Sequence, residues 1–224
     1  MKSILLFFTF CTLLIASKCK KDTPAPPPPQ AGTGDYAPYT LGSTFVYEST
    51  ATGMATQDVT LTVTVDSTVD GLVYKKLESN KPTVFPSRFV NYTNGVQREA
   101  QFNIDLGGTV VPKLILTNLK INEAVNANWT ESQVFNIPAL PIPVTVNFVH
   151  TLTAKNISYQ VLATNFANVI KVNTVGTAVV PGGIMLPAGT NTSFTLGNSY
   201  AKSVGLVERV TANQTLKLKT YTIR

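Results

Sequence analysis

The stretch Asp58-Val59-Thr60-Leu61-Thr62-Val63-Thr64-Val65-Asp66 alternates between two kinds of side chain along its whole length. Its valines and its leucine share one parity, and its threonines share the other. Successive side chains of a β-strand point to opposite faces of the sheet. The pattern therefore predicts a strand with one face on a core and one face toward water.

A second alternating stretch, Pro143–Ala154, extends this prediction to the C-terminal half of the chain. The residues on its apolar parity are Val144, Val146, Phe148, His150, Leu152 and Ala154. Val and Thr together make up a quarter of the chain, with 25 and 31 of its 224 residues. Such enrichment is typical of β-strands.

Further candidate strands fill most of the remaining chain. They are Thr44–Glu48, Gly71–Glu78, Phe85–Tyr92, Val96–Ile104, Pro112–Thr117, Trp129–Asn136, Tyr159–Ala163, Asn168–Val180, Ser193–Ala201, Gly205–Ala212 and Gln214–Ile223. The turn sequences between them are Val69-Asp70-Gly71, Asn94-Gly95, Gly107-Gly108 and Pro181-Gly182-Gly183, of which Asn94-Gly95 is the strongest hairpin signal. No long stretch has helical periodicity, and we expect at most one short helix, in Asn118–Ala127.

Many strands at this spacing without helices predict an all-β domain with a largely antiparallel sheet. We expect a curved sheet that forms a half-barrel or barrel, and a β-sandwich is the alternative.

The composition excludes several classes of site. With two Cys and one His in 224 residues, neither a disulfide-rich scaffold nor a Cys₄ or Cys₂His₂ zinc site can be assembled. The formal charge of +6 is concentrated at the start, because Lys2, Lys18, Lys20 and Lys21 less Asp22 supply half of it. Basic residues do not cluster with aromatic ones along a strand, apart from Lys217 and Lys219 near Tyr221, so we expect no nucleic-acid partner.

The first residues resemble an export signal. Met1 and Lys2 precede an apolar run, Ile4 to Ala16, that is shorter than the roughly 20 residues of a membrane-spanning helix. The following Ser17-Lys18-Cys19-Lys20-Lys21-Asp22 resembles the start of Bacteroidetes-type lipoproteins. The resemblance implies a signal peptide over residues 1–18 and acyl chains on Cys19. Lys18 stands where that family has a small residue, and plain secretion or an uncleaved anchor are the alternatives.

The segment after Cys19 has the composition of a spacer. Proline is abundant from residue 24 to 29 and favours extended polyproline II, and two glycines follow at 32 and 34. We therefore expect residues 19–34 to hold the lipidation site and a tether, and residues 35–224 to form a single domain.

The expected domain also resembles a group of secreted Bacteroidetes-type lipoproteins. The stretches that carry the resemblance are Ala37–Glu48, Phe166–Val172 and Ser199–Glu208, the last with Tyr-Ala-x-x-Val-Gly-Leu-Val. It implies a curved antiparallel sheet similar to lipoprotein-carrier half-barrels, and it implies no activity.

No catalytic, metal-binding or cofactor-binding residue is predicted. His150 lies on an apolar parity without a Gly-x-Ser-x-Gly nucleophile motif, and we interpret it as a strand-end or partly buried histidine with a local hydrogen bond. The acids are scattered, so spacing alone neither shows nor excludes a glycosidase pair. Trp129 with Tyr36, Tyr39 and Tyr47 could form a platform that stacks on sugars, although packing is the commoner use of such aromatics.

These observations favour a non-enzymatic lipoprotein tethered to the outer membrane and facing the periplasm or the cell surface. We expect it to bind an apolar or amphipathic ligand, or a protein partner, on the concave side of the sheet. A carbohydrate-binding or carbohydrate-active envelope protein is the alternative, and a purely structural envelope component is a third.

Overall fold

The computed structural model describes residues 35–105, 110–136, 143–179 and 193–224. The predicted signal peptide, Cys19 and the proline-rich tether lie outside these residues, as do the Gly107-Gly108 and Pro181-Gly182-Gly183 turns. These expectations, and the domain boundaries that depend on them, stay predictions.

The described chain forms strands joined by turns, and no helix occurs in the described ranges. The strands are β1 (Thr44–Ala51), β2 (Gln57–Val69), β3 (Leu72–Ser79), β4 (Arg88–Thr93), β5 (Val96–Asp105), β6 (Val110–Lys120), β7 (Asn128–Phe135), β8 (Val144–Val161), β9 (Thr164–Val179), β10 (Ser193–Ala201), β11 (Gly205–Thr211) and β12 (Gln214–Thr222).

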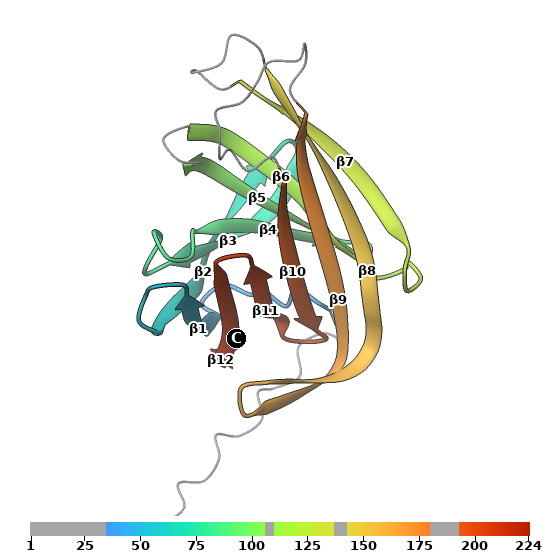
Figure 1. Cartoon of the computed structure of the whole chain (residues 1–224). Helices are drawn as coiled ribbons and strands as arrows, with labels where there is room; N and C mark the ends of the chain where they lie inside the picture. The colour runs from blue at the N-terminus through green and yellow to red at the C-terminus, as the bar shows by residue number, and fades with distance from the viewer. Residues whose placement is uncertain (1–34, 106–109, 137–142, 180–192) are drawn as a thin grey trace, which may run out of the picture.

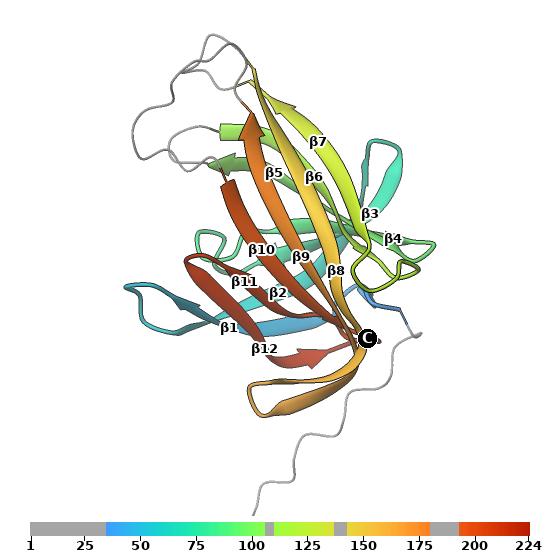
Figure 2. The same ribbon diagram turned by 45° about the vertical axis from the view of Figure 1, so that its right-hand side comes forward.

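All of these strands belong to one 12-stranded antiparallel sheet in the order β6-β5-β4-β3-β2-β1-β12-β11-β10-β9-β8-β7. Figures 1 and 2 show the sheet curling into a nearly closed barrel, with β7 coming round toward β6. The all-β prediction and the curved antiparallel sheet are therefore confirmed, and the sandwich alternative is wrong.

Two hairpin turns follow directly from the sequence. Asn94 and Gly95 have φ values of 53° and 78° between β4 and β5, and Asp70 and Gly71 have 47° and 78° between β2 and β3. Positive φ at both central residues is the type I′ geometry that matches the twist of the flanking strands. The prediction of a hairpin at Asn94-Gly95 is confirmed.

Several predicted details are wrong. Val65 was expected on the core face of its strand, but the pairing of β2 with β3 shifts between Val63 and Val65, and Val65 is 47% exposed. A bulge inserts one residue and reverses the faces beyond it. The short helix expected in Asn118–Ala127 is absent, because Asn118 to Lys120 continue β6 and Val96 pairs with Lys120.

The boundaries of two strands also differ from the prediction. Pro143–Ala154 and Tyr159–Ala163 were expected as separate strands, whereas β8 runs through both with irregularities between Leu152 and Tyr159. The predicted strand at Phe85 begins instead at Arg88, because Val84 and Phe85 bond back to Lys81 in a turn.

A hydrophobic core fills one half of the barrel. It includes Phe45, Tyr47, Leu61, Leu152 and Tyr200, all at most 1% exposed. The hairpin between β8 and β9 folds under this half in Figure 1. The N-terminal segment packs there as well: the Tyr36 hydroxyl donates to the Asn168 carbonyl at 3.0 Å. Side chains fill this half of the barrel, so a site that binds a ligand inside the barrel would have to lie in the other half.

Candidate functional site

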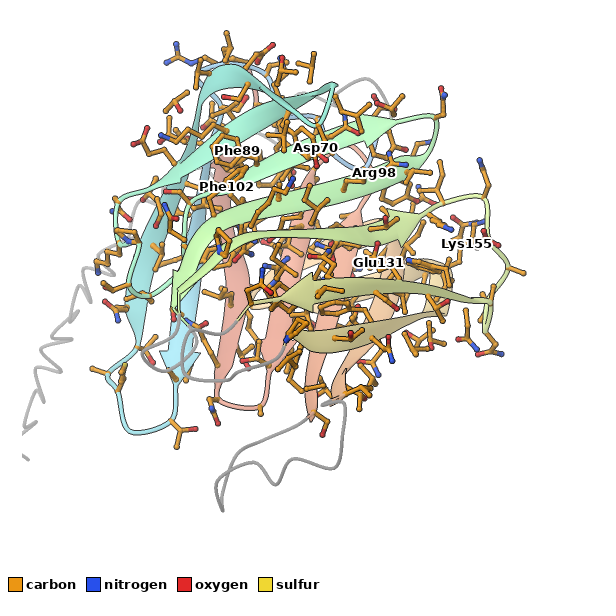
Figure 3. All side chains as sticks on the ribbon, turned by 90° about the horizontal axis from the view of Figure 1, so that it is seen from above. Asp70, Phe89, Arg98, Phe102, Glu131 and Lys155 are labelled. Atoms are coloured by element: carbon orange, nitrogen blue, oxygen red, sulfur yellow. The ribbon has the colours of Figure 1, made fainter. Side chains whose placement is uncertain are left out.

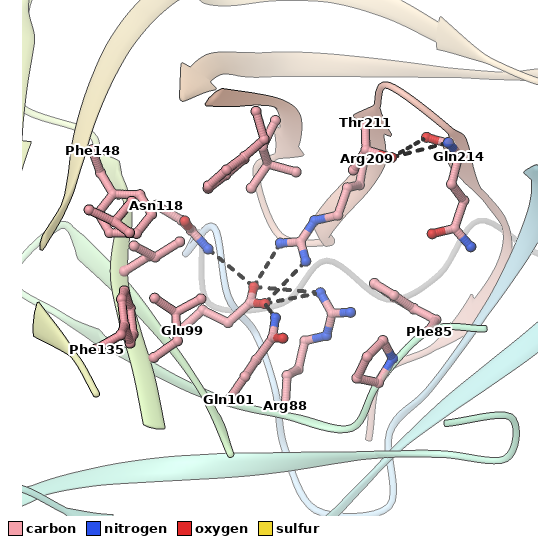
Figure 4. Close-up of a pocket in the computed structure, with 16 residues that line it drawn as sticks. Phe85, Arg88, Glu99, Gln101, Asn118, Phe135, Phe148, Arg209, Thr211 and Gln214 are labelled. Atoms are coloured by element: carbon pink, nitrogen blue, oxygen red, sulfur yellow. Dashed lines mark hydrogen bonds and ion pairs between the residues drawn. The ribbon is translucent and has the colours of Figure 1, made fainter. Parts of the chain in front are cut away.

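The other half of the barrel contains a cavity of about 370 Å³ (Figure 4). Strands from both sides of the barrel contribute its apolar walls. The apolar lining residues are Phe85, Pro86, Leu114, Leu116, Phe135, Val146, Phe148, Phe194 and Leu196. A concave, mostly apolar pocket with a few polar groups is the usual form of a small-molecule site, and its size lies near the lower end of the usual range.

Ionised side chains meet at one side of this cavity (Figure 4). Arg88 of β4, Glu99 of β5 and Arg209 of β11 are 1%, 5% and 7% exposed. We call these three residues the ion triad. Because it holds two guanidinium groups and one carboxylate, the ion triad carries a net charge of +1 on side chains that are at most 7% exposed.

Glu99 is fully occupied as an acceptor. Arg209 donates to its two carboxylate oxygens through Nη1 at 3.1 Å and Nη2 at 2.7 Å. Gln101 Nε2 donates at 2.7 Å and Asn118 Nδ2 at 3.1 Å. A carboxylate has about four lone-pair sites, so these donors already saturate it.

The two guanidinium groups differ in how many of their nitrogens have hydrogen-bond partners. Arg209 also donates from Nε to Asn198 Oδ1 at 2.8 Å, so each of its three nitrogens has a partner. Arg88 reaches Glu99 through Nη1 at 3.4 Å, while its Nε and Nη2 have no hydrogen-bond partner among the described residues. Its guanidinium carbon lies 3.4 Å from the centre of the Phe85 ring, a cation–π contact.

The pKa values of the three residues reflect this difference in hydrogen bonding. Burial alone would raise the pKa of Glu99, but the charges of Arg209 and Arg88 outweigh it and lower the pKa to about 2. Burial lowers the pKa of Arg88 to about 10 against the opposing attraction of Glu99. The pKa of Arg209 is raised, because its contact with Glu99 outweighs its burial. At neutral pH all three groups are charged.

The barrel is joined between β6 and β7 by side chains that bond to backbone groups. Trp129 Nε1 donates to the Thr117 carbonyl at 2.8 Å, and Glu131 Oε1 accepts from the Thr117 amide at 2.7 Å. Gln133 bonds to the Ile115 amide at 3.4 Å and also donates to the Ile115 carbonyl. We call this line of contacts the seam, and Figure 3 shows Glu131 within it.

His150 supports the seam from inside the barrel. Its Nε2 lies 2.9 Å from Glu131 Oε1, its Nδ1 lies 2.8 Å from Thr174 Oγ1, and its ring stacks on Trp129. Burial raises the pKa of Glu131, but the bonds from His150 and Thr117 outweigh it and leave the pKa below its usual value. The local hydrogen bonds predicted for His150 are confirmed, but its side chain is completely rather than partly buried, at 0% exposed.

The aromatic residues considered for a sugar platform are used in packing. Trp129, Tyr36, Tyr39 and Tyr47 are all buried in the hydrophobic core. The hypothesis of an exposed stacking platform made from them is therefore wrong.

The ion triad was missed by sequence reasoning, which noted Glu99 only as one of several scattered acids. Arg88 and Arg209 lie within predicted strands, but nothing in their spacing shows that β4, β5 and β11 bring them together. An Arg or Glu inside an apolar strand, as in Leu206-Val207-Glu208-Arg209-Val210, is the one available signal. Within the described ranges, no three His, Cys, Asp or Glu side chains are grouped in a way that suits a metal ion.

No helix in the described part of the chain has the length and apolar character needed to cross a membrane. No family model and no curated protein matches the sequence. Among solved structures, a Bacteroides fragilis protein described as a candidate exported protein with a YmcC-like fold is similar, with a TM-score of 0.41 and 8% identity over 83% of this chain and 97% of that chain. A likeness at this level says nothing of a ligand or an activity.

Proposed function

We propose that this chain is an exported envelope lipoprotein whose barrel binds an apolar ligand without catalysing a reaction. The observation that carries the binding proposal is the cavity of about 370 Å³, walled mainly by Leu, Val and Phe side chains. Burying a ligand chain against such walls gains about 25 cal/mol for each Å² of apolar surface removed from water.

A fluorescent apolar probe whose emission rises on leaving water tests this proposal. We expect saturable binding to the purified protein and competition by medium-chain alcohols. Leu116→Trp should weaken binding strongly, because Leu116 lines the cavity and the larger ring would take up part of its volume. Val134→Trp is the matched control, since Val134 lies on β7 and is 64% exposed. Equal binding by both variants would contradict the proposal.

The proposed localisation to the cell envelope rests on the sequence alone, through the signal-like residues 1–18 and Cys19. Expression with a labelled fatty acid tests it: we expect label in the wild-type protein and none after Cys19→Ala. Equal label in both proteins would exclude the anchor and leave plain secretion or an uncleaved signal.

A further inference from the structure

The ion triad gives the cavity a charge that an apolar ligand alone would not satisfy. Among the described residues that line the cavity, the charged side chains are the cations Arg88 and Arg209 and the anion Glu99. Burial of an uncompensated charge is among the most costly features a folded protein can carry.

The uncompensated charge is located on Arg88. Glu99 is saturated by Arg209, Gln101 and Asn118, and its contact to Arg88 is the longest of the set at 3.4 Å. The atoms of Arg88 without partners among the described residues are Nε and Nη2. These two atoms form one edge of the planar guanidinium, opposite Nη1, and their N–H bonds run parallel. Such an edge is the fork that binds both oxygens of a carboxylate. Both atoms are buried in the ligand-free structure, so a carboxylate reaches the edge only when side chains that cover it move aside.

From this arrangement we propose that the ligand is an amphipathic monocarboxylate, with its carboxylate on the Nε–Nη2 edge of Arg88 and its chain in the apolar cavity. This inference rests on the proposed function and names the chemical class of its ligand.

Charge and volume both restrict the class. A monoanion brings the net charge of the site from +1 to zero, whereas a phosphate monoester carries about −1.5 to −2 at neutral pH and overcompensates it. With about 30 Å³ for each methylene-sized group, taken from the volume per water molecule in the liquid, a cavity of about 370 Å³ holds roughly twelve such groups. A carboxylate with a chain of about ten carbons therefore fits.

The test compares decanoate, decan-1-ol and decyl phosphate by displacement of the apolar probe at pH 7.5, below the concentrations at which they form micelles. We expect decanoate to bind roughly ten- to a hundredfold more tightly than decan-1-ol, the range for hydrogen bonds to a charged partner. Arg88→Met should remove this preference while keeping affinity for decan-1-ol. Arg88→Lys keeps the charge but not the fork, and should retain a smaller preference.

Arg98→Met is the control for loss of a positive charge. Arg98 neighbours Glu99 on β5 and lies on the outer face of the barrel (Figure 3), so the preference for decanoate should be unchanged. Circular dichroism of each variant verifies folding, and if Arg88→Met does not fold, Arg88→Lys carries the comparison.

Each outcome separates the two proposals. Equal affinity for decanoate and decan-1-ol, or a preference that survives in both Arg88 variants, overturns the carboxylate inference and leaves apolar binding intact. Tighter binding of decyl phosphate than of decanoate overturns the choice of a carboxylate. If no compound displaces the probe and the probe itself does not bind, both the inference and the proposed function fail.

Discussion

The ion triad predicts unequal effects on stability for two substitutions that each remove one charge. Glu99→Gln leaves Arg88 and Arg209 facing each other with a net buried charge of +2. It also replaces an acceptor that now receives hydrogen bonds from Arg209 at 2.7 Å and Gln101 at 2.7 Å. Removing one partner of a buried ion pair costs about 3–5 kcal/mol. For a domain of this size we expect the melting temperature to fall by roughly 10 °C.

Arg88→Met should instead leave stability nearly unchanged or raise it. The variant keeps the pairing of Glu99 with Arg209 and brings the net charge of the triad to zero. It loses the long contact of Arg88 Nη1 with Glu99 at 3.4 Å and the contact of the guanidinium with the Phe85 ring, the latter worth roughly 0.5–2 kcal/mol. What it relieves is the desolvation of a buried cation, several kcal/mol in proteins.

Equilibrium unfolding in urea measures both effects in the ligand-free protein. Trp129 is the single tryptophan of the chain, so its fluorescence and the far-ultraviolet circular dichroism give independent transitions. Arg98→Met controls for a change of net charge on the outer face. The reasoning is refuted if Arg88→Met destabilises the protein as much as Glu99→Gln does, because Arg88 would then be a required partner of the carboxylate.

Three further predictions follow from the same contacts. The pKa of folded Glu99 is lowered to about 2 from an ordinary 4.5, so its contribution to stability is complete above about pH 4.5 and is lost as the pH falls toward 2. In Glu99→Gln, the midpoint of urea unfolding should therefore depend less on pH over that range. Glu131→Ala should speed hydrogen exchange of the Thr117 amide by about tenfold or more, because it removes the 2.7 Å acceptor, while Ser132→Ala on the same strand leaves the exchange unchanged. Arg209→Met should destabilise the protein by several kcal/mol in urea unfolding, since it breaks both hydrogen bonds from Arg209 to Glu99 and leaves Asn198 Oδ1 without its donor. A loss as small as that of Arg88→Met would contradict the unequal roles of the two arginines.

Strand content was predictable because alternation and turn chemistry act locally. Asn94-Gly95 and Asp70-Gly71 adopt the positive φ values that their residue types accept, wherever the strands end up in the fold. Irregularities of pairing were not predictable, because a bulge such as the one between Val63 and Val65 depends on the partner strand. The continuity of β8 past Leu152 has the same origin, since its irregularities are accommodated by β9.

The alternation of polar and apolar residues, which predicted the strands, assigns the wrong face of β5 to the interior of the barrel and so does not reveal the candidate site. On β5 the apolar parity, with Ala100 and Phe102, faces outward, where Phe102 packs edge-on against Phe89 at 5.2 Å (Figure 3). The polar parity, with Glu99 and Gln101, faces the cavity. An assignment from hydrophobicity alone would place the apolar residues of β5 inside the barrel and its polar residues outside. The structure has the opposite arrangement, because the polar residues of β5 line a cavity inside the barrel.

The unequal roles of the two arginines also explain why a charged site can exist in this barrel. Arg209 and Glu99 form a hydrogen-bonded unit with Gln101, Asn118 and Asn198, and these bonds offset part of the cost of burying the two charges. Among the described residues, Asn118 Oδ1 and Asn198 Nδ2 have no partner of their own. Arg88 lies beside that unit and adds a second positive charge. Its contact with Glu99 is long, at 3.4 Å, and its Nε and Nη2 have no hydrogen-bond partner among the described residues. If Arg88 served stability alone, an apolar residue would serve better at its position. The buried and incompletely paired guanidinium of Arg88 is therefore the feature that motivates the proposal of a ligand with a negative charge.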